Sequence, residues 1–359
     1  MKKILLFSKY SRMGASSRLR THQYVTYLEQ LDYKVTVSPL FNDKYLKALY
    51  SKQPISKILV LKLYFKRLMT LITCFDYDIL WIEKELFPYF PAIFERALRL
   101  FGVKFIVDYD DAIFHNYDLS SNYLIKRFLG NKIDKVMALS TATVAGNQYL
   151  SDRAISAGSK NVKIIPTVVD ITRYSVKETD NKKTVVGWIG SPSTQKYVVE
   201  LLPVFLKLSK SVVFKLVLVG ATEDIVDQLT GLDVEVIPWG EDTEVNNIQS
   251  MDIGIMPLHN GPWEKGKCGY KLIQYMACGK PVVASKVGAN IEIVNSPSIG
   301  FLADNSEEFY DCLVKILNDP LRRKSMGLSG RKIVKSKYTV QAQLPALNQV
   351  FTAIESETV

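Results

Sequence analysis

Two consecutive series of short apolar runs, each alternating with segments of helical periodicity, constrain the fold of this chain more than any other feature. The runs are rich in Val and Ile and lack a polar residue at every second position, which is typical of parallel strands covered on both faces. In the first series the predicted strands are Ile4–Phe7, Lys34–Val37, Ile79–Ile82, Lys104–Val107, Val136–Leu139 and Thr143–Ala145. In the second series they are Val185–Ile189, Lys215–Val219, Val234–Ile237, Ile253–Met256 and Pro281–Ala284.

The segments between these strands carry apolar residues at helical spacing. The predicted helices are Leu19–Leu31, Ile55–Phe75, Ile93–Phe101, Tyr149–Ile155, Val198–Leu208, Ile225–Leu229, Tyr270–Cys278 and Phe309–Leu317. Two successive β-α-β series predict an α/β protein with two Rossmann-like, doubly wound domains facing a central cleft. The polar stretch Asp170–Lys183 separates a first domain of residues 1–170 from a second of residues 171–340. Residues 341–359 are expected to form a C-terminal helix that packs back on the first domain.

Composition excludes several classes of protein. The 359 residues are 47% hydrophobic and 23% charged, which is typical of a globular chain. The first apolar run is too short for a signal peptide, and no run is long enough for a spanning helix. The cysteines have no metal-ligand spacing and fit a reducing compartment, so we expect a cytoplasmic protein without a disulfide framework.

The net charge of +10 is confined to one half of the chain. Residues 1–170 contain 25 Lys and Arg against 15 Asp and Glu, whereas residues 171–359 contain 21 of each. Seven of these cations lie in residues 44–75, where no acid occurs: Lys44, Lys47, Lys52, Lys57, Lys62, Lys66 and Arg67. A one-sided positive field attracts an anionic partner, although a solvated basic face without a partner has the same composition.

The predicted helix Ile55–Phe75 carries four of these cations at spacings that gather them toward one side. An amphipathic helix of this kind is typical of either a core helix with a solvated basic face or a surface helix resting on an anionic membrane. We favour the membrane because the whole net charge lies in this half of the chain. The protein is then expected to be peripheral on the inner face of the membrane.

Two loops of the first domain carry chemistry-bearing residues after predicted strands. In Ser8–Ser17, Gly14 permits a tight turn and Ser16 or Ser17 can cap the following helix. Arg12 and Arg18 provide cations near exposed amides that bind anions, although a plain strand–helix turn has the same pattern. In Asp108–His115, three carboxylates occur within four residues, which favours a site that binds substrate hydroxyls or accepts a proton. A metal would need ligands beyond His115, so we expect no metal.

Two loops of the second domain resemble phosphate sites. In Gly187–Lys196, Gly190 ends a strand, and Ser191 and Thr194 supply hydroxyls. Lys196 brings a cation to the start of a helix, where a cation opposes the helix dipole unless it faces a bound phosphate. In Asp252–Ser285, a helix begins near Gly269 and stops at Gly279. Lys267 and Lys271 flank that helix start, which predicts a diphosphate site, and Gln274 lies one turn further on the same side.

The same stretches resemble the family 4 glycosyltransferases, whose fold is GT-B. The phrase Lys271–Ser285 (KLIQYMACGKPVVAS) is similar to that family's donor-site helix and the following strand, and Asp252–Leu258 resembles the preceding strand. Val168–Asp170 and Val144–Leu150 resemble the end of the first domain. Together these matches extend over nearly the whole chain.

The resemblance implies a metal-independent enzyme without a cofactor that transfers a sugar from a nucleoside diphosphate donor, with retention. The acceptor would be a hydroxyl of a glycan or a lipid-linked molecule, in bacterial surface polysaccharide or glycoconjugate synthesis. The expected catalytic residues are Asp110, Asp111, Lys196 and Lys271. The expected donor-binding residues are Gly190, Ser191, Thr194, Trp239, Glu264, Gly266, Lys267, Cys268, Gly269, Tyr270 and Gln274. Gly14, Ser16 and Arg18 are expected on the acceptor or phosphate side.

The sequence departs from the family at a pair of glutamates eight positions apart. Gln274 occupies the second position and Gly266 the first, so neither supplies a carboxylate. Glu264, two residues earlier, is the candidate replacement. Gln274 can still hold ribose hydroxyls through its amide.

Three alternatives belong to other classes. A nucleotide-sugar epimerase of the same fold would need acid and base groups, which only Asp108–Asp111 provides. A dinucleotide-dependent oxidoreductase is disfavoured because G-x-G-x-x-G and its acidic ribose partner are missing. A nucleic-acid-binding protein is suggested by charge alone and lacks aromatic and basic recognition motifs, so we expect no nucleic-acid partner.

Overall fold

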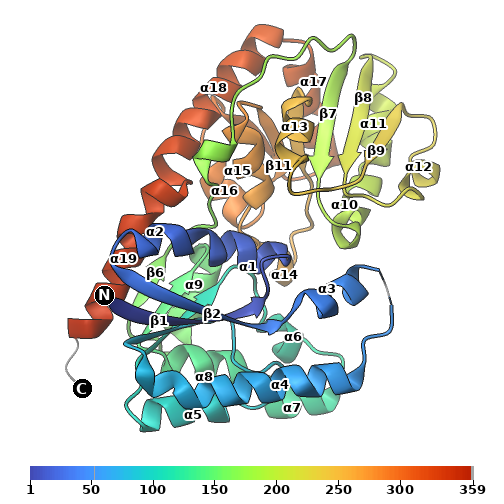
Figure 1. The fold of residues 1–359 in the computed structure, drawn as a ribbon. Coiled ribbons are helices and arrows are strands. Elements are labelled where there is room, and N and C mark those ends of the chain that lie inside the picture. The colour runs from blue at the N-terminus through green and yellow to red at the C-terminus, as the bar shows by residue number, and fades with distance from the viewer. Residues whose placement is uncertain (52, 357–359) are drawn as a thin grey trace. The chain divides into compact units, whose positions relative to one another are not determined.

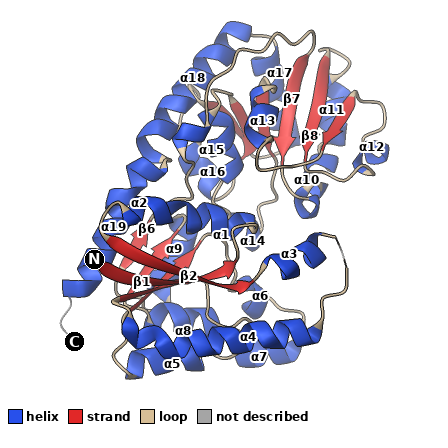
Figure 2. Ribbon diagram, in the orientation of Figure 1, coloured by secondary structure: helices blue, strands red, loops and turns tan. Residues whose placement is uncertain are grey.

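A computed structural model describes residues 1–51 and 53–356, and Lys52 and residues 357–359 of the predicted C-terminal helix lie outside them. The chain divides into two compact units. Unit 1 comprises Met1–Thr167, Gly266–Cys268 and Gln343–Val359, and unit 2 comprises Val168–Lys265 and Gly269–Ala342. Both units are parallel α/β structures (Figures 1 and 2), which confirms the predicted fold class. The cleft expected between them stays a prediction.

Unit 1 contains a six-stranded sheet in the order β2-β1-β3-β4-β5-β6. Its strands are β1 (Lys2–Tyr10), β2 (Tyr33–Phe41), β3 (Ile79–Glu83), β4 (Phe105–Tyr109), β5 (Ala142–Ala145) and β6 (Val162–Ile164). Its helices are α1 (Ala15–Arg20), α2 (Val25–Glu29), α3 (Asp43–Tyr50), α4 (Lys57–Ile72), α5 (Ile93–Leu100), α6 (His115–Asp118), α7 (Tyr123–Leu129), α8 (Lys132–Leu139), α9 (Gln148–Ser156) and most of α19 (Val340–Ser356). Short 3-10 turns, η1 (His22–Tyr24) and η2 (Thr73–Asp76), complete the unit.

Helices cover both faces of this sheet. On one face, Leu71 of α4, Leu98 of α5 and Leu129 of α7 belong to a single hydrophobic cluster that includes strand residues such as Phe7. Figure 1 shows α4, α5, α7 and α8 together on this side. On the other face, Phe351 of α19 packs edge-on against the buried Trp81, with ring centroids 5.4 Å apart. The last helix is therefore part of the core of unit 1.

Unit 2 contains a second six-stranded sheet in the order β12-β11-β10-β7-β8-β9, the Rossmann order. Its strands are β7 (Thr184–Ile189), β8 (Phe214–Val219), β9 (Val234–Ile237), β10 (Ile253–Met256), β11 (Val282–Ser285) and β12 (Gly300–Ala303). Its helices are α10 (Lys196–Val199), α11 (Leu202–Leu208), α12 (Ile225–Gln228), α13 (Glu244–Gln249), α14 (Pro262–Lys265), α15 (Tyr270–Ala277), α16 (Ala289–Ile293), α17 (Ser306–Leu317) and α18 (Pro320–Lys337), with the 3-10 turns η3 (Ile171–Arg173) and η4 (Pro192–Thr194).

The polar stretch after residue 170 is part of unit 2 rather than a free linker. The carboxylate of Asp252 at the start of β10 accepts hydrogen bonds from the Asn181 amide, at 2.9 Å, and from the backbone N–H of Val185, at 2.8 Å. These bonds attach the stretch to the amino-terminal end of the second sheet. The first continuous segment of unit 1 ends at Thr167, three residues before the predicted boundary.

Two of the predicted elements of unit 1 are wrong. Val136–Leu139 is the end of helix α8, not a strand, because Ile133, Val136 and Met137 are buried at helical spacing. The predicted helix Leu19–Leu31 is broken between α1 and α2 by the turn η1. The short strands β6 and β12 were not predicted.

Candidate functional site

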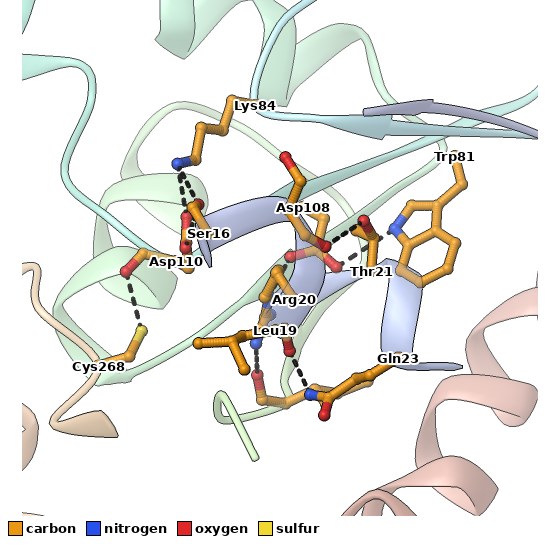
Figure 3. A network of polar contacts seen from close by, with 12 residues as sticks. Ser16, Leu19, Arg20, Thr21, Gln23, Trp81, Lys84, Asp108, Asp110 and Cys268 are labelled. Atoms are coloured by element: carbon orange, nitrogen blue, oxygen red, sulfur yellow. Dashed lines mark hydrogen bonds and ion pairs between the residues drawn. The ribbon is translucent and has the colours of Figure 1, made fainter. Parts of the chain in front are cut away.

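The carboxyl ends of β1, β3 and β4 in unit 1 bring together Ser16, Lys84 and Asp110 (Figure 3). The Lys84 ammonium lies 2.8 Å from one carboxylate oxygen of Asp110 and donates to the Ser16 hydroxyl at 3.0 Å. Ser16 in turn donates to the other oxygen of Asp110 at 2.7 Å. Strand order reverses between β1 and β3, and at such a switch point α/β sheets bind ligands.

Lys84 was missed by the sequence reasoning and is the central cation of this cluster. It is 4% exposed and has a φ of +68°, a left-handed conformation that is costly for a residue with a side chain. Backbone strain of this kind persists where surrounding contacts fix the residue. The sequence signal was available: Glu83-Lys84-Glu85 directly follows the apolar residues Ile79–Ile82, which were predicted as a strand.

The two neighbouring carboxylates, Asp110 and Asp111, have pKa values shifted in opposite directions. Burial would raise the pKa of Asp110, but the Lys84 ammonium and the hydrogen bonds from Lys84 and Ser16 lower it well below the ordinary value. Burial and the negative charge of Asp110 raise the pKa of Asp111. Carboxylates whose pKa values are pushed apart are suited to different tasks.

The third carboxylate of the predicted cluster, Asp108, has a structural role. It is 2% exposed and forms an ion pair with the buried Arg20 guanidinium, and it accepts a hydrogen bond from the Trp81 indole at 3.2 Å (Figure 3). Arg20 also donates to the carbonyl oxygen of Ile165 at 2.6 Å. Asp108 therefore ties α1 to the sheet.

The segment Gly266–Cys268, predicted as part of the donor-binding domain, belongs to unit 1. Asn147 donates to the carbonyl oxygens of Gly266 and Lys267, both at 3.1 Å, and the Cys268 thiol lies 3.0 Å from the carbonyl oxygen of Asp110. A Cβ on Gly266 would lie 2.4 Å from the Cβ of Ala112, so only glycine fits there. This packing places the charge of Lys267 where it lowers the pKa of Asp111.

The remaining predicted residues of the first loop are Gly14 and Arg18. The predicted serine cap is wrong, because Gly14 is the N-cap of α1 and Ser16 lies inside the helix. A Cβ on Gly14 would lie 2.4 Å from the Cβ of Tyr10, so the loop closes tightly on the end of β1. Arg18 is 3% exposed on α1. Arg18 is thus withdrawn from solvent, and a direct role in phosphate binding stays a prediction.

In unit 2, Lys271 and the end of β7 meet at the second switch point, between β7 and β10. The Lys271 ammonium lies 4.5 Å from the centroid of the Trp188 ring and 3.5 Å from the Thr194 hydroxyl. A Cβ on Gly190 would approach this ammonium to 2.7 Å and the Trp188 ring to 2.2 Å. The structure thus brings the predicted residues Gly190, Thr194 and Lys271 together, and adds Trp188 as the surface on which the lysine lies.

The first turn of helix α15 begins directly beside this cation. Gly269 caps the helix with a φ of +62°, and a Cβ there would lie 2.3 Å from the Cδ1 of Ile293. Tyr270 and Lys271 are the first two helical residues. Backbone amides at such a helix start, together with the adjacent ammonium, form an arrangement that stabilises negative charge.

The loop after β7 is ordered by its own hydroxyls. Ser191 and Thr194 form a reciprocal capping box at η4, and the Ser191 and Ser193 hydroxyls lie 2.9 Å apart. Lys196 begins α10, where its exposed side chain has its ammonium 5.1 Å from the Tyr197 ring centroid. A role of Lys196 in phosphate binding stays a prediction.

A buried polar network connects Gln274 on α15 to Trp239 after β9. The Gln274 amide donates to the Tyr174 hydroxyl at 3.1 Å, and this hydroxyl lies 3.4 Å from the Tyr270 hydroxyl. Tyr174 also donates to Glu244 at 3.4 Å, and the other oxygen of Glu244 accepts from the Trp239 indole at 3.2 Å. Gln274 is 4% exposed, and its amide is engaged in this network. Ribose binding by Gln274 stays a prediction.

Glu244 was also missed by the sequence reasoning, because it lies outside every motif. It is 3% exposed, and its carboxylate sets the orientation of the Trp239 indole, which is 40% exposed. Gly220 packs closely against both Gly190 and Trp239. A Cβ on Gly220 would lie 2.3 Å from the Gly190 carbonyl oxygen and 3.1 Å from the Trp239 Cβ.

Glu264 lies on α14 and accepts a hydrogen bond from the Tyr197 hydroxyl. It is therefore bound to α10, and its replacement of the missing glutamate stays a prediction. Near it, at the carboxyl ends of β10, β11 and β12, lies a pocket of about 260 Å³. The pocket is lined by residues that include Tyr197, His259, Ser285 and Lys286.

Metal ligands are not clustered in the part of the chain that the structure describes, where no three His, Cys, Asp or Glu side chains converge. His115 is held between Asp118, at 2.8 Å, and the Tyr149 hydroxyl, at 2.9 Å. Along the same described residues, no helix has both the length and the apolar character needed to span a bilayer.

Comparison with known proteins identifies the class of this fold. Residues 183–319 match the family "Glycosyl transferases group 1". The whole chain superimposes on sucrose-phosphate synthase from Thermosynechococcus elongatus with a TM-score of 0.75 at 12% identity, covering 100% of both chains. HepE from Anabaena, in complex with UDP-glucose, gives a TM-score of 0.74 at 16% identity over 98% of this chain and 100% of that chain. The fold is therefore the GT-B fold, and residues 183–319 of unit 2 are similar to the glycosyl transferases group 1 family.

Among curated relatives, the chain is similar to the capsular polysaccharide biosynthesis glycosyltransferase CapM of Staphylococcus aureus. The two are 24% identical over 189 residues, which is 50% of this chain and 48% of CapM. The chain thus spans about half the length of this relative. The match supports the resemblance stated from the sequence; family 4 itself stays a prediction.

Proposed function

We propose that this protein is a glycosyltransferase that moves a sugar from a nucleoside diphosphate donor to a hydroxyl acceptor, with retention and without a metal. The observation that carries the proposal is the position of Lys271. Its ammonium lies at the start of α15, beside Gly190, at the switch point of a Rossmann-order sheet. The group 1 domain in the same residues supports it.

Unit 2 supplies the groups that stabilise a departing diphosphate. Negative charge develops on the leaving phosphate as the bond to the sugar breaks, and fixed cations and amides aimed at that charge lower the barrier. The Lys271 ammonium is held over Trp188 and beside Thr194, so little rearrangement is needed when charge appears. The amides at the start of α15 add to the same field.

Unit 1 supplies the groups that contact a hydroxyl. Asp110 is engaged by Lys84 and Ser16, so we assign it to holding the cluster in place. Burial and the charge of Asp110 raise the pKa of Asp111, a direction that suits a residue exchanging a proton with a hydroxyl. We therefore propose Asp111 as the residue that contacts the acceptor hydroxyl or the donor sugar.

The acceptor we propose is a glycan or a lipid-linked molecule of bacterial surface polysaccharide or glycoconjugate synthesis. CapM, which is similar over half of this chain, is named for capsular polysaccharide biosynthesis. HepE holds UDP-glucose, which supports a nucleoside diphosphate sugar as donor.

A nucleotide-sugar epimerase of the same fold is the second candidate, favoured by the Asp110, Asp111 and Lys84 cluster alone. Release of nucleoside diphosphate separates the two functions. A transferase releases much more diphosphate when an acceptor is added, whereas an epimerase converts the donor sugar with no dependence on acceptor. Conversion of the donor sugar at equal rates with and without acceptor would favour the epimerase.

Replacing Trp239 by Ala is expected to weaken nucleotide binding by about 10-fold or more, because stacking of a base on an aromatic ring is worth roughly 1–3 kcal/mol. The half-exposed indole is fixed by Glu244 and lies next to the Gly190 turn. Calorimetric titration of the purified protein measures the effect. Trp239→Phe retains an aromatic face and should bind the nucleotide nearly normally. If both variants lost the same affinity, Trp239 would not be the residue on which the base stacks.

Chelation of divalent metal is expected to leave transfer activity nearly unchanged. In the proposed mechanism, Lys271 and helix amides neutralise the diphosphate, so the charge of a metal ion is not required. Initial rates with and without EDTA measure this, and activity abolished by EDTA and restored by Mg²⁺ would show that a metal performs the task assigned to Lys271.

A further inference from the structure

Helix α4 of unit 1 has two distinct faces. One face is buried and includes Leu63, Arg67 and Leu71. The other exposes large apolar side chains at intervals of three or four residues: Ile58, Leu61, Phe65, Met69 and Ile72. Leu61 is 70% exposed and Phe65 61%, whereas side chains of this kind are normally withdrawn from water.

The structure corrects the predicted basic face of this helix at one residue. Arg67 is 2% exposed and donates to the carbonyl oxygens of Ser8, at 2.6 Å, and Ser38, at 3.0 Å. It joins the helix to β1 and β2 instead of facing outward. Lys57, Lys62 and Lys66 are exposed and flank the apolar stripe.

Two further helices extend this surface. The buried sides of α4, α5 and α7 belong to one hydrophobic cluster on the same face of the first sheet, so their outer sides face away from that sheet together (Figure 1). Phe75, after α4, contacts Phe101, after α5, with ring centroids 6.3 Å apart. The large apolar side chains that α5 and α7 expose are Ile93, Leu100, Tyr123, Leu124 and Phe128.

The exposed charges on these three helices have one sign. Every residue of α4, α5 and α7 is described by the structure, and their single acid, Glu95, is 1% exposed and accepts from the backbone N–H of Leu86. The exposed cations are Lys57, Lys62, Lys66, Arg96, Arg99, Lys126 and Arg127. The nearest exposed acid in sequence, Asp76, lies beyond the end of α4 in η2.

We propose that the outer surface of α4, α5 and α7 binds an anionic lipid bilayer, with its apolar side chains inserted among the lipids. Apolar stripes flanked by lysine and arginine are suited to the boundary between acyl chains and anionic headgroups, because the long basic side chains reach the headgroups. The centre of an interface with a second copy of the chain would instead be depleted of lysine. The surface is independent of the proposed catalytic residues.

Sedimentation of the full chain with lipid vesicles tests this proposal. We expect strong binding to vesicles of equimolar phosphatidylglycerol and phosphatidylcholine, and weak binding to phosphatidylcholine alone. Binding should weaken as salt shortens the Debye length from about 10 Å at 0.1 M to about 3 Å at 1 M. A variant with Lys57→Gln, Lys62→Gln and Lys66→Gln should bind roughly 100-fold more weakly, since each surface lysine strengthens such binding about fivefold.

An apolar variant separates insertion from simple electrostatic adhesion. Leu61→Gln, Phe65→Gln and Phe128→Gln keep every charge, and we expect a loss of vesicle binding of at least 10-fold, with the circular dichroism spectrum unchanged. Matched controls lie on unit 2. The charge control replaces three exposed lysines: Lys210→Gln, Lys332→Gln and Lys335→Gln. The apolar control replaces two exposed apolar residues: Val213→Gln and Leu321→Gln. Both controls should bind like the wild type.

A fluorescent label at position 65 reports insertion directly. All four native cysteines are buried, so Phe65→Cys can be labelled selectively with an environment-sensitive dye. We expect a blue shift of its emission on anionic vesicles. The proposal is overturned if the wild type does not sediment with anionic vesicles or if the label stays in water. It is also overturned if the apolar variant loses self-association in sedimentation velocity but keeps its vesicle binding.

Discussion

Replacing Lys271 by Ala is expected to lower the turnover number for sugar transfer by on the order of 100-fold or more. The reason is the loss of a cation that is fixed where the leaving diphosphate acquires charge, a contact that matters more in the transition state than in the bound donor. The donor KM should change less than the turnover number. Steady-state rates of nucleoside diphosphate release measure both quantities.

Lys315 provides a control for this substitution. It is an exposed lysine on α17 of unit 2. Lys315→Ala should keep nearly normal turnover. Lys196→Ala is expected to have an effect smaller than Lys271→Ala, because its side chain is exposed. Full activity in Lys271→Ala would show that Lys271 does not stabilise the leaving diphosphate, and the proposed mechanism depends on that role.

Replacing Lys84 by Gln is expected to lower transfer activity by on the order of 100-fold and to change its pH dependence. The substitution leaves the Asp110 carboxylate buried without its cation, which is costly unless the acid takes up a proton. The pKa of Asp110 therefore rises, and the acidic limb of the pH–activity profile should move to higher pH. A profile of the turnover number between acid and neutral pH measures the shift.

A double-mutant cycle shows whether Lys84 acts through Asp110. Asp110→Asn alone should also reduce activity, and the double variant should be less impaired than the sum of the two single losses, because the unpaired buried charge is gone. Asp111→Asn should retain folding and lose activity. Asp152→Asn, an exposed acid on α9, is the control and should behave like the wild type. Normal kinetics in both Asp110→Asn and Asp111→Asn would make the cluster structural.

The sequence predicted the parts of the site that depend on local pattern. Gly190, Thr194 and Lys271 follow strands or begin helices, and parallel topology carries such positions to one edge of a sheet, so their proximity could be inferred. The same reasoning located Ser16 and Asp110 after β1 and β4. Strand existence was predictable for the same reason, because buried parallel strands are apolar throughout.

The rest depended on contacts between segments far apart in the chain. Lys84 belongs to the candidate site because Asp110 and Ser16 pair with it, and no local pattern shows that pairing. Gly266–Cys268 lies in the sequence of the second domain, yet Asn147 and the Asp110 carbonyl bind it within unit 1. Arg67 has a helical spacing that fits the basic face, and only its bonds to β1 and β2 show that it faces inward.

Calorimetric titration of the wild type and of Lys271→Ala with UDP, GDP, dTDP and CMP tests the central claim most directly. The account predicts that one nucleoside diphosphate binds the wild type without added metal, and that Lys271→Ala binds the same nucleotide at least 10-fold more weakly, because the ammonium that faces its phosphates is missing. Absence of binding by every nucleotide, or equal affinity in both proteins, would contradict the donor site proposed at Lys271.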